Sequence, residues 1–348
     1  MDEARVVVAR RLLEQSVHCQ RLGSALYAHL LARAAADVER GGPAWEVLAG
    51  HEDDAEGSAL ALRFLGAVHR VVLEGRAPAL GRHYPSAGGS SGAADAWPAL
   101  AAALVEHRDD LRRRVEDPVQ TNDVGRSAAL VGGFLLVASA TGLPLRLLEL
   151  GTSAGLNLRF DCYRYEGGDQ GFGDRASPVR FSDVFIEPYP PFATPAQVVE
   201  RAGCDPRPID PTSEEGRKTL LAYTWPDQVG RLRQLDAAIE VARRVPVSLT
   251  KASAAAWLED GLDRPVPGVA TVVFHSIVMQ YLGDHERQRI DELVAEAGSA
   301  SRSSAPLARL AMEPRGELAD VRLCLWPGGE ERLVARAGYH GRPVHWHG

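Results

Sequence analysis

The sequence predicts an α/β fold, in which a mainly parallel sheet with helices on both faces follows an all-helical region. Three observations support this prediction. Before residue 140, apolar residues recur at helical spacing, and no segment alternates as a strand does. After residue 140, short apolar runs alternate with helical segments, which is typical of βαβ units and a parallel sheet. The strongest run, Val269–His275, is mostly apolar, as in a strand buried on both faces.

The N-terminal region is predicted to consist of successive helices. The first pattern ends at Gly41-Gly42-Pro43 and is carried by Leu12, Leu13, Val17, Leu22, Leu26, Leu30 and Leu31. A second helix, Ser58–Glu74, precedes a Gly/Ser-rich loop over residues 81–96, and a third spans Trp97–Glu116. We interpret Asp123–Ala140 as a buried helix, because the uncharged stretch Ser127–Leu145, which overlaps it, is interrupted by the turn sequence T-G-L-P.

The C-terminal region is predicted to alternate strands and helices. The expected strands are Leu145–Leu150, Val198–Cys204, Val247–Thr250, Val269–His275, Leu307–Met312, Val321–Trp326 and Arg332–Ala337. The expected helices open at Gly155–Phe160 and continue with Glu214–Tyr223, Gln228–Arg244, Ala254–Leu262 and Asp284–Ala297. The last two strands flank Pro327-Gly328-Gly329 and should form an antiparallel hairpin. We therefore expect two domains: residues 1–140, a lid or pocket wall, and residues 141–348, a Rossmann-like domain.

Composition limits the possible partners and the compartment. The chain has 348 residues, 45% of them hydrophobic, and a net charge of -7, which disfavours nucleic acid and membrane surfaces as partners. The four cysteines are far apart and form no C-x-x-C pair, so we expect no metal site, no disulfide framework and a cytoplasmic location. The charged N-terminus is unlike a secretory signal.

The glycine turn at residues 148–155, L-E-L-G-T-S-A-G, is the strongest motif. It lies between a predicted strand and a predicted helix, where small residues let a ligand approach the backbone and the helix N-terminus offers N–H groups. The pattern resembles motif I of class I S-adenosylmethionine-dependent methyltransferases, although Ser153 interrupts the fuller G-x-G-x-G form. The cofactor-binding candidates are Glu149, Gly151, Thr152, Ser153, Gly155 and Asn157.

The same residues allow a second interpretation. G-T-S-A-G is also a G-x-S-x-G nucleophile elbow, with Ser153 as the nucleophile of a serine hydrolase. A late histidine, His340, His345 or His347, would then complete the site. Topology disfavours this interpretation, because several strands precede the elbow in α/β-hydrolases, whereas the residues before the motif strand are predicted to be helical.

An acid at the end of the second strand would accept hydrogen bonds from a ribose in a methyltransferase-like sheet. The segment R-A-G-C-D-P-R-P-I-D offers Asp205 as the first choice and Asp210 as the second. This assignment requires residues 163–196 to be an insertion, and it would be wrong if Asp183 ended the second strand. A turn-forming role for Asp205 before proline is an equally simple alternative.

Polar residues after the strand Val269–His275 should point into the ligand crevice, because they follow the carboxyl end of that strand. His275 is a candidate general base and Tyr281 a second catalytic candidate, with Ser276 and Gln280 beside them. A histidine simply hydrogen-bonded at a strand end is the alternative. Two further segments supply candidate substrate-binding residues, namely Gln120, Thr121, Asn122 and Arg126 before the buried helix, and Asp161 and Tyr163 after the glycine turn.

Segments along nearly the whole chain resemble a bacterial family, Domain of Unknown Function 2332. They are PVQTNDVGR, LLELGTSAGLNLRFDCYRY, ERAGCDPRPIDPTS, YTWPDQVGRLRQLDAAIEVA, VVFHSIVMQYL, LWPGGEERLVAR and GSALYAHLLARAAADVERGGPAWEVLAGHEDD. The resemblance implies a methyltransferase-like fold with a helical N-terminal region. This sequence departs from its relatives at Ser253, where they tend to carry an Asp that would hold the adenine amino group.

The expected function is methyl transfer from S-adenosylmethionine to a small molecule. Glu149, the turn Gly151–Gly155 and Asp205 would hold the cofactor. Two alternatives remain open: a non-catalytic ligand-binding protein that keeps the fold, which Ser153 and Ser253 favour, and the serine hydrolase.

Overall fold

The computed structural model describes residues 2–263 and 265–348, and these divide into two compact units. The helical unit contains residues 2–121 and 213–233, and the sheet unit contains residues 122–212 and 234–348. The mixed α/β class and the helical N-terminal region agree with the sequence prediction. The boundary between the two units lies after residue 121 and not at the predicted residue 140. Periodicity shows that the segment before residue 140 is helical, but not which unit it packs against.

The helical unit is built from α1 to α7 and α9. The apolar faces of α1 to α7 form one core, which includes Leu12, Leu30, Phe64 and Leu104. Helix α4 is buried nearly all round, and its buried residues include Arg63, His69 and Arg70, which an amphipathic pattern would place on the exposed face. The bounds are α1 (Glu3–Arg21), α2 (Ala25–Glu39), α3 (Pro43–Leu48), α4 (Leu60–Leu73), α5 (Pro78–Gly81), α6 (Ala96–Glu106), α7 (Arg108–Val115) and α9 (Glu214–Ala222), with 3-10 turns η1 (Glu56–Ser58), η2 (Pro85–Ala87) and η3 (Ala93–Asp95).

A buried histidine joins the two stretches of chain that make up the helical unit. His69 Nδ1 lies 3.1 Å from the carbonyl oxygen of Ala222, and Nε2 lies 2.6 Å from Ser86 Oγ. A carbonyl only accepts, so Nδ1 carries the proton and Nε2 accepts from the serine hydroxyl. The loop predicted at residues 81–96 therefore contributes a partly buried hydrogen-bond partner, Ser86, to this unit.

We expect the helical unit to lose stability in acid because of His69. Burial lowers the pKa of His69 from 6.5 to about 4. The unfolded chain therefore binds a proton that the folded unit excludes, so the stabilisation is complete above pH 6.5 and is lost as the pH falls toward 4. The loss should be about 3 kcal/mol. Hydrogen exchange of α4 measures it.

Matched variants isolate the contribution of His69. His69→Gln cannot titrate and should flatten this part of the pH dependence, whereas His18→Gln, on an exposed part of α1, should leave it unchanged. An equal pH dependence in the wild type and in His69→Gln would contradict the assignment.

The sheet unit contains a nine-stranded sheet among its described residues, with the order β5-β12-β11-β10-β9-β8-β1-β6-β7. The strands β7, β6, β1, β8 and β9 run parallel to one another, and β9 to β12 form an antiparallel meander. The predicted hairpin around residues 327–329 is confirmed. The bounds are β1 (Leu145–Leu150), β5 (Phe185–Ile186), β6 (Val198–Asp205), β7 (Ser248–Lys251), β8 (Ala270–Ser276), β9 (Leu307–Arg315), β10 (Leu318–Trp326), β11 (Glu330–Ala337) and β12 (Val344–Trp346).

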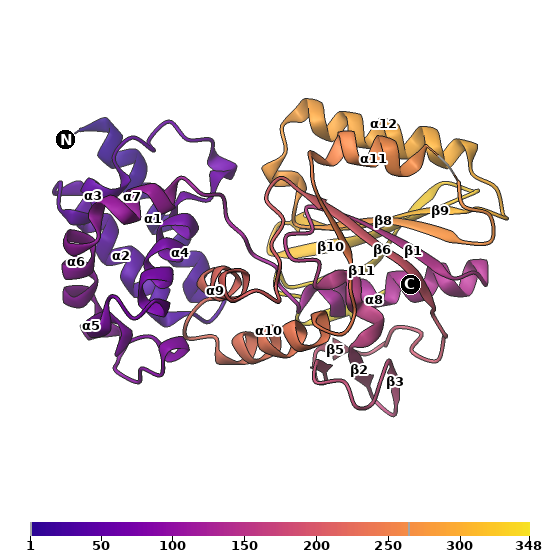
Figure 1. The fold of residues 1–348 in the computed structure, drawn as a ribbon, viewed down its shortest axis with the longest axis horizontal. Coiled ribbons are helices and arrows are strands. Elements are labelled where there is room, and N and C mark those ends of the chain that lie inside the picture. The colour runs from indigo at the N-terminus through magenta and orange to yellow at the C-terminus, as the bar shows by residue number, and fades with distance from the viewer. Residues whose placement is uncertain (1, 264) are drawn as a thin grey trace. The chain divides into compact units, whose positions relative to one another are not determined.

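Helices cover both faces of this sheet (Figure 1). Helices α11 (Ala254–Leu262) and α12 (Asp284–Ala300) pack on one face through Leu258 and Ile290. Helix α8 (Arg126–Thr141) packs on the other face, where Gly132 and Gly133 leave room for Trp346 and Leu310. Strand β8 lies between the two layers and is buried along its whole length.

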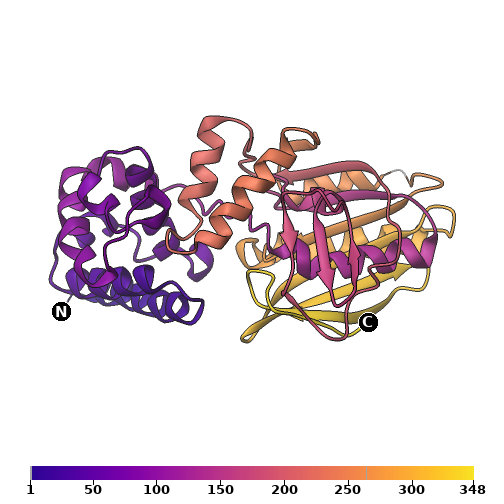
Figure 2. The ribbon, with the colours of Figure 1, turned by 90° about the horizontal axis from the view of Figure 1, so that it is seen from below.

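The insertion predicted at residues 163–196 holds a second, small sheet with the order β3-β2-β4. It lies on the outer side of α8 (Figures 1 and 2), and Phe160 stacks on Phe134 of that helix. Its strands are β2 (Arg164–Gly167), β3 (Gln170–Phe172) and β4 (Arg180–Phe181). Helix α10 (Val229–Ala242) contributes residues to both units. No helix of the described residues combines the length and the apolar character needed to cross a bilayer.

Candidate functional site

The order of strands in the sheet changes direction between β1 and β8. From β1 the chain adds β6 and β7 on one side, and then crosses to add β8 and β9 on the other. In open parallel sheets, a ligand crevice lies outside the carboxyl ends of the two strands at such a switch point. Glu149 and Gly151 lie at that end of β1, and His275 and Ser276 end β8. The structure therefore brings the glycine turn and the His275 segment together.

The glycine turn is tightly constrained. Gly151 has a φ of +64°, and a Cβ at this position would lie 2.6 Å from Val278 Cγ2. Ser153 also adopts a left-handed conformation, with a φ of +49°. The Thr152 hydroxyl donates to Glu149 Oε2 at 2.5 Å. Glycine at 151 therefore allows close approach between this turn and the segment after β8.

Glu149 is the most strongly perturbed carboxyl of this site. Its side chain is 2% exposed, and burial raises its pKa to about 8, although the Thr152 hydrogen bond and the charge of Arg159 oppose the rise. At neutral pH, Glu149 is therefore mostly protonated. A cationic ligand group placed beside Glu149 would favour its ionised form. Binding of such a group would therefore release the proton of Glu149.

The helix predicted to open at Gly155–Phe160 is wrong. The segment is a 3-10 turn, η4 (Asn157–Cys162), with non-helical backbone angles at Arg159. The Arg159 guanidinium bonds the carbonyl oxygens of Gly155 and Val245, each at 2.8 Å. The first of these bonds takes the carbonyl oxygen of Gly155, which in a regular helix would accept from a backbone N–H, and the second fixes the guanidinium on the segment before β7. The expected row of free N–H groups at a helix N-terminus is therefore not a feature of this turn.

Asp205 lies where the sequence placed it, at the end of β6 beside β1. Its Oδ2 accepts from the Ser153 N–H at 2.9 Å, and its Oδ1 accepts from the Arg207 N–H at 2.8 Å. The carboxylate thus holds the glycine turn and its own turn together, and each oxygen retains a lone pair. Asp183 lies between β4 and β5, away from the end of the second strand of the main sheet, and Asp210 accepts from Thr212.

The segment before α8 also reaches the glycine turn. Asn122 Oδ1 accepts from the Leu156 N–H at 2.9 Å. Asn157, predicted to bind the cofactor, accepts from the Ser127 hydroxyl at 2.7 Å and is 1% exposed. These bonds tie the turn to the start of α8.

Arg126 links α8 to the end of β8 and to the C-terminal loop. Its Nη1 donates to the Ser276 carbonyl at 2.7 Å, and its Nε donates to the Tyr339 carbonyl at 3.2 Å. His340 Nδ1 lies 2.6 Å from Asp123 Oδ2. Sequence reasoning did not pair Asp123 with His340, because no local pattern relates residues so far apart.

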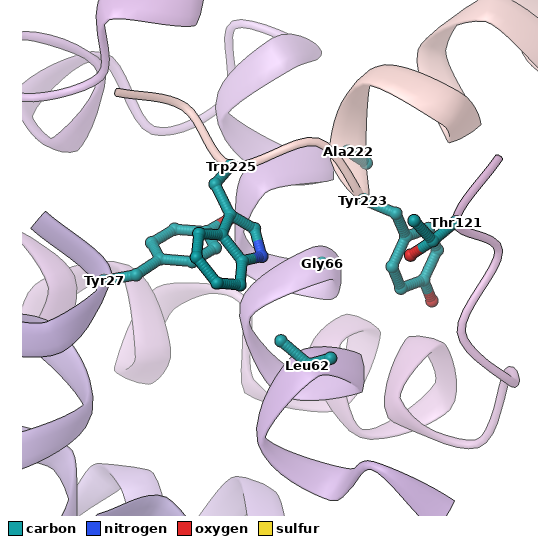
Figure 3. Close-up of a pocket in the computed structure, with 7 residues that line it drawn as sticks. All are labelled: Tyr27, Leu62, Gly66, Thr121, Ala222, Tyr223 and Trp225. Carbon is teal, nitrogen blue, oxygen red and sulfur yellow. The ribbon is translucent and has the colours of Figure 1, made fainter. Parts of the chain in front are cut away.

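Gln120 and Thr121 belong to the helical unit. There, Thr121 lines a cavity of about 10 Å³ with Tyr27, Tyr223 and Trp225, and Figure 3 shows these side chains around it. This volume is room for one water molecule, so the cavity is too small for a substrate.

His275 is 1% exposed, and its Nδ1 lies 2.7 Å from Glu313 Oε1. Gln280 and Tyr281 follow on the surface in the 3-10 turn η5 (Met279–Tyr281), where Tyr281 is 48% exposed. Asp161 instead forms an ion pair with Arg201, in the middle of β6, at 2.5 Å. Tyr163 is buried and donates to the Leu156 carbonyl oxygen. Sequence reasoning missed Glu313, which lies on β9 with no motif around it.

A comparison with protein families identifies the family of the chain. Residues 9–346 match the model of a family described as an uncharacterized protein conserved in bacteria, DUF2332. The chain belongs to the DUF2332 family. No curated protein and no solved structure matches it. In this DUF2332 chain, the residues at the switch point between β1 and β8 are the candidate functional site.

Proposed function

We propose that the chain binds S-adenosylmethionine at the carboxyl ends of β1 and β8 and transfers the methyl group to a small molecule. The observation that carries this proposal is the position of Glu149 and the glycine turn. Glu149 lies near the carboxyl end of β1 and the glycine turn follows it, and at this strand a sheet of the order β7-β6-β1-β8-β9 changes direction. Dinucleotide and nucleoside ligands bind at this place in doubly wound sheets.

The residues at this place fit the ligand. Glu149 and the turn Gly151–Gly155 would hold the methionine part, where a buried carboxyl favours a positively charged group. Asp205 would bind the ribose hydroxyls through its remaining lone pairs. When bound, S-adenosylmethionine supplies an electrophilic methyl group, so the protein mainly provides orientation.

The end of β7 is where the adenine would lie. Ser253 precedes α11 there, is exposed, and makes no capping hydrogen bond through its side chain. A serine hydroxyl accepts a weaker hydrogen bond than the carboxylate of an aspartate. We therefore expect the adenine to contribute less to affinity than the methionine and ribose parts.

Calorimetry with S-adenosylmethionine and S-adenosylhomocysteine tests the proposal. We expect binding that Glu149→Gln weakens about tenfold when the pH is above the pKa of Glu149, because the variant loses the charge that faces the cationic ligand. Glu200→Gln removes a half-exposed carboxylate from neighbouring β6 and should change nothing. No binding at millimolar ligand would refute the cofactor. Binding without methyl transfer to any acceptor would instead identify a non-catalytic ligand-binding protein.

One observation favours a second candidate, the serine hydrolase. Ser153 has the left-handed backbone that a nucleophile elbow requires, with a φ of +49°. The segment after the elbow is a 3-10 turn where that fold has an α-helix, and the described residues before β1 form no strand. A fluorophosphonate probe should label Ser153 if this candidate is right, and Ser153→Ala should abolish the labelling.

A further inference from the structure

His275 and Glu313 form a pair in which the proton position is determined by the surrounding donors. Glu313 Oε1 also accepts from the Val278 N–H at 3.0 Å and from the Met279 N–H at 3.4 Å. Burial opposes ionisation of Glu313, but the His275 hydrogen bond and these two N–H groups outweigh it and lower its pKa. The carboxylate is therefore an acceptor, and His275 Nδ1 carries the proton.

When the imidazole is neutral, the other ring nitrogen, Nε2, is an acceptor with a free lone pair. It is buried, and it has no hydrogen-bond partner among residues 2–263 and 265–348. An unsatisfied buried polar atom costs free energy and calls for a donor from outside the chain.

The backbone after β8 is strained in a way that maintains this pair. Ile277 has a φ of +55°, which is a genuine outlier for a β-branched residue. This conformation turns the chain sharply at the end of β8, and the N–H groups of Val278 and Met279 then reach Glu313. Strain of this kind persists where the surrounding structure over-determines it, and such residues cluster at functional sites.

We propose that His275 Nε2 accepts a hydrogen bond from a neutral hydroxyl group of the methyl acceptor, and that Glu313 is the positioning residue for this contact. The inference rests on the proposed methyl transfer and names its substrate class, an alcohol or a phenol. A neutral hydroxyl suits Nε2 better than an ammonium group, because desolvating a charge beside a buried imidazole is costly.

The reaction balances with these groups alone. The hydroxyl oxygen forms a bond to the methyl carbon while the methyl–sulfur bond breaks, and the electron pair of that bond stays on sulfur. The hydroxyl proton passes to His275 Nε2, and the Glu313 carboxylate stabilises the imidazolium that results. The products are a methyl ether, S-adenosylhomocysteine and a protonated His275.

Nitrogen-15 NMR of the histidine rings of the full chain tests this proposal without any cofactor. Phenol and anisole serve as probes, since they differ by the presence of the hydroxyl proton. We expect phenol to shift the His275 Nε2 resonance and anisole to leave it in place. An unshifted resonance, or equal shifts with both probes, would overturn the proposal and would indicate that an ordered water alone satisfies Nε2.

Glu313→Gln tests the positioning role. The amide keeps the size of the side chain and its acceptor oxygen, but not its charge. We expect a reduced preference for the Nδ1–H tautomer and at least fivefold weaker phenol binding, whereas Glu296→Gln, exposed on α12, should change neither. Unchanged tautomer and affinity would refute the role of Glu313. The wild-type measurement needs no variant, so it decides the hydroxyl contact even if Glu313→Gln fails to fold.

The two proposals can fail separately. A phenol-specific shift without S-adenosylmethionine binding would leave the hydroxyl contact and refute methyl transfer. Binding of S-adenosylmethionine without a phenol-specific shift would leave the cofactor proposal and refute the hydroxyl contact.

Discussion

Gly151→Ala is expected to lower the free energy of unfolding of the sheet unit by about 3 kcal/mol. Two effects add. A left-handed backbone, here with a φ of +64°, is unfavourable for alanine, and the new methyl group would lie 2.6 Å from Val278 Cγ2. Relief of that contact requires the segment after β8 to move away from the glycine turn. Hydrogen exchange of β1 and β8 measures the change in the unit concerned.

Gly142→Ala is the matched control. Gly142 has the same φ of +64°, but no heavy atom lies within 4 Å of a Cβ at that position among the described residues. It should therefore cost only the backbone term, about 1 kcal/mol. Equal losses in the two variants would show that contact between the turn and Val278 is not what requires glycine at position 151.

Glu149→Gln is expected to stabilise the sheet unit in alkaline solution. Burial raises the pKa of Glu149 from 4.5 to about 8 in the folded chain, so its contribution to stability is complete below pH 4.5 and is lost as the pH rises through 8. The shift corresponds to about 5 kcal/mol. Gln cannot ionise, so the variant should escape this loss.

The measurement compares the wild type, Glu149→Gln and Glu200→Gln between pH 5 and pH 9 by hydrogen exchange of β1. The wild type and Glu200→Gln should lose stability together, while Glu149→Gln should change little. Parallel behaviour of all three proteins would contradict the raised pKa. A buried acid that weakens the fold when it ionises is typical of a binding site, where a ligand compensates the charge.

The sequence pattern predicted most of the regular structure. The helix Ala254–Leu262 and the strand Leu145–Leu150 have the predicted bounds, and the buried strand near Val269–His275 differs by one residue at each end. These elements were predictable because their apolar spacing and flanking turn residues are local properties of the chain. The predicted helix at Gly155–Phe160 is wrong because the Arg159 guanidinium, which also bonds the distant Val245 carbonyl oxygen, takes the Gly155 carbonyl oxygen that a helix would use.

The candidate site was predictable only in part. Motif spacing identified Glu149, the glycine turn and Asp205, and the structure places all three at the ends of neighbouring strands. Motif spacing gave no signal for Glu313, which lies 38 residues after its hydrogen-bond partner His275. The same holds for His340, which contacts Asp123 across 217 residues.

By itself, the sequence determined that the chain has a helical region and a parallel sheet, and that a glycine turn follows the first strand. Only the tertiary structure decided that α8 packs on the sheet, that the Asp205 carboxylate accepts from the Ser153 and Arg207 N–H groups, and that His275 pairs with Glu313. The reason is that periodicity reports which face of an element is buried, whereas the partner of a buried polar group depends on strand order and register.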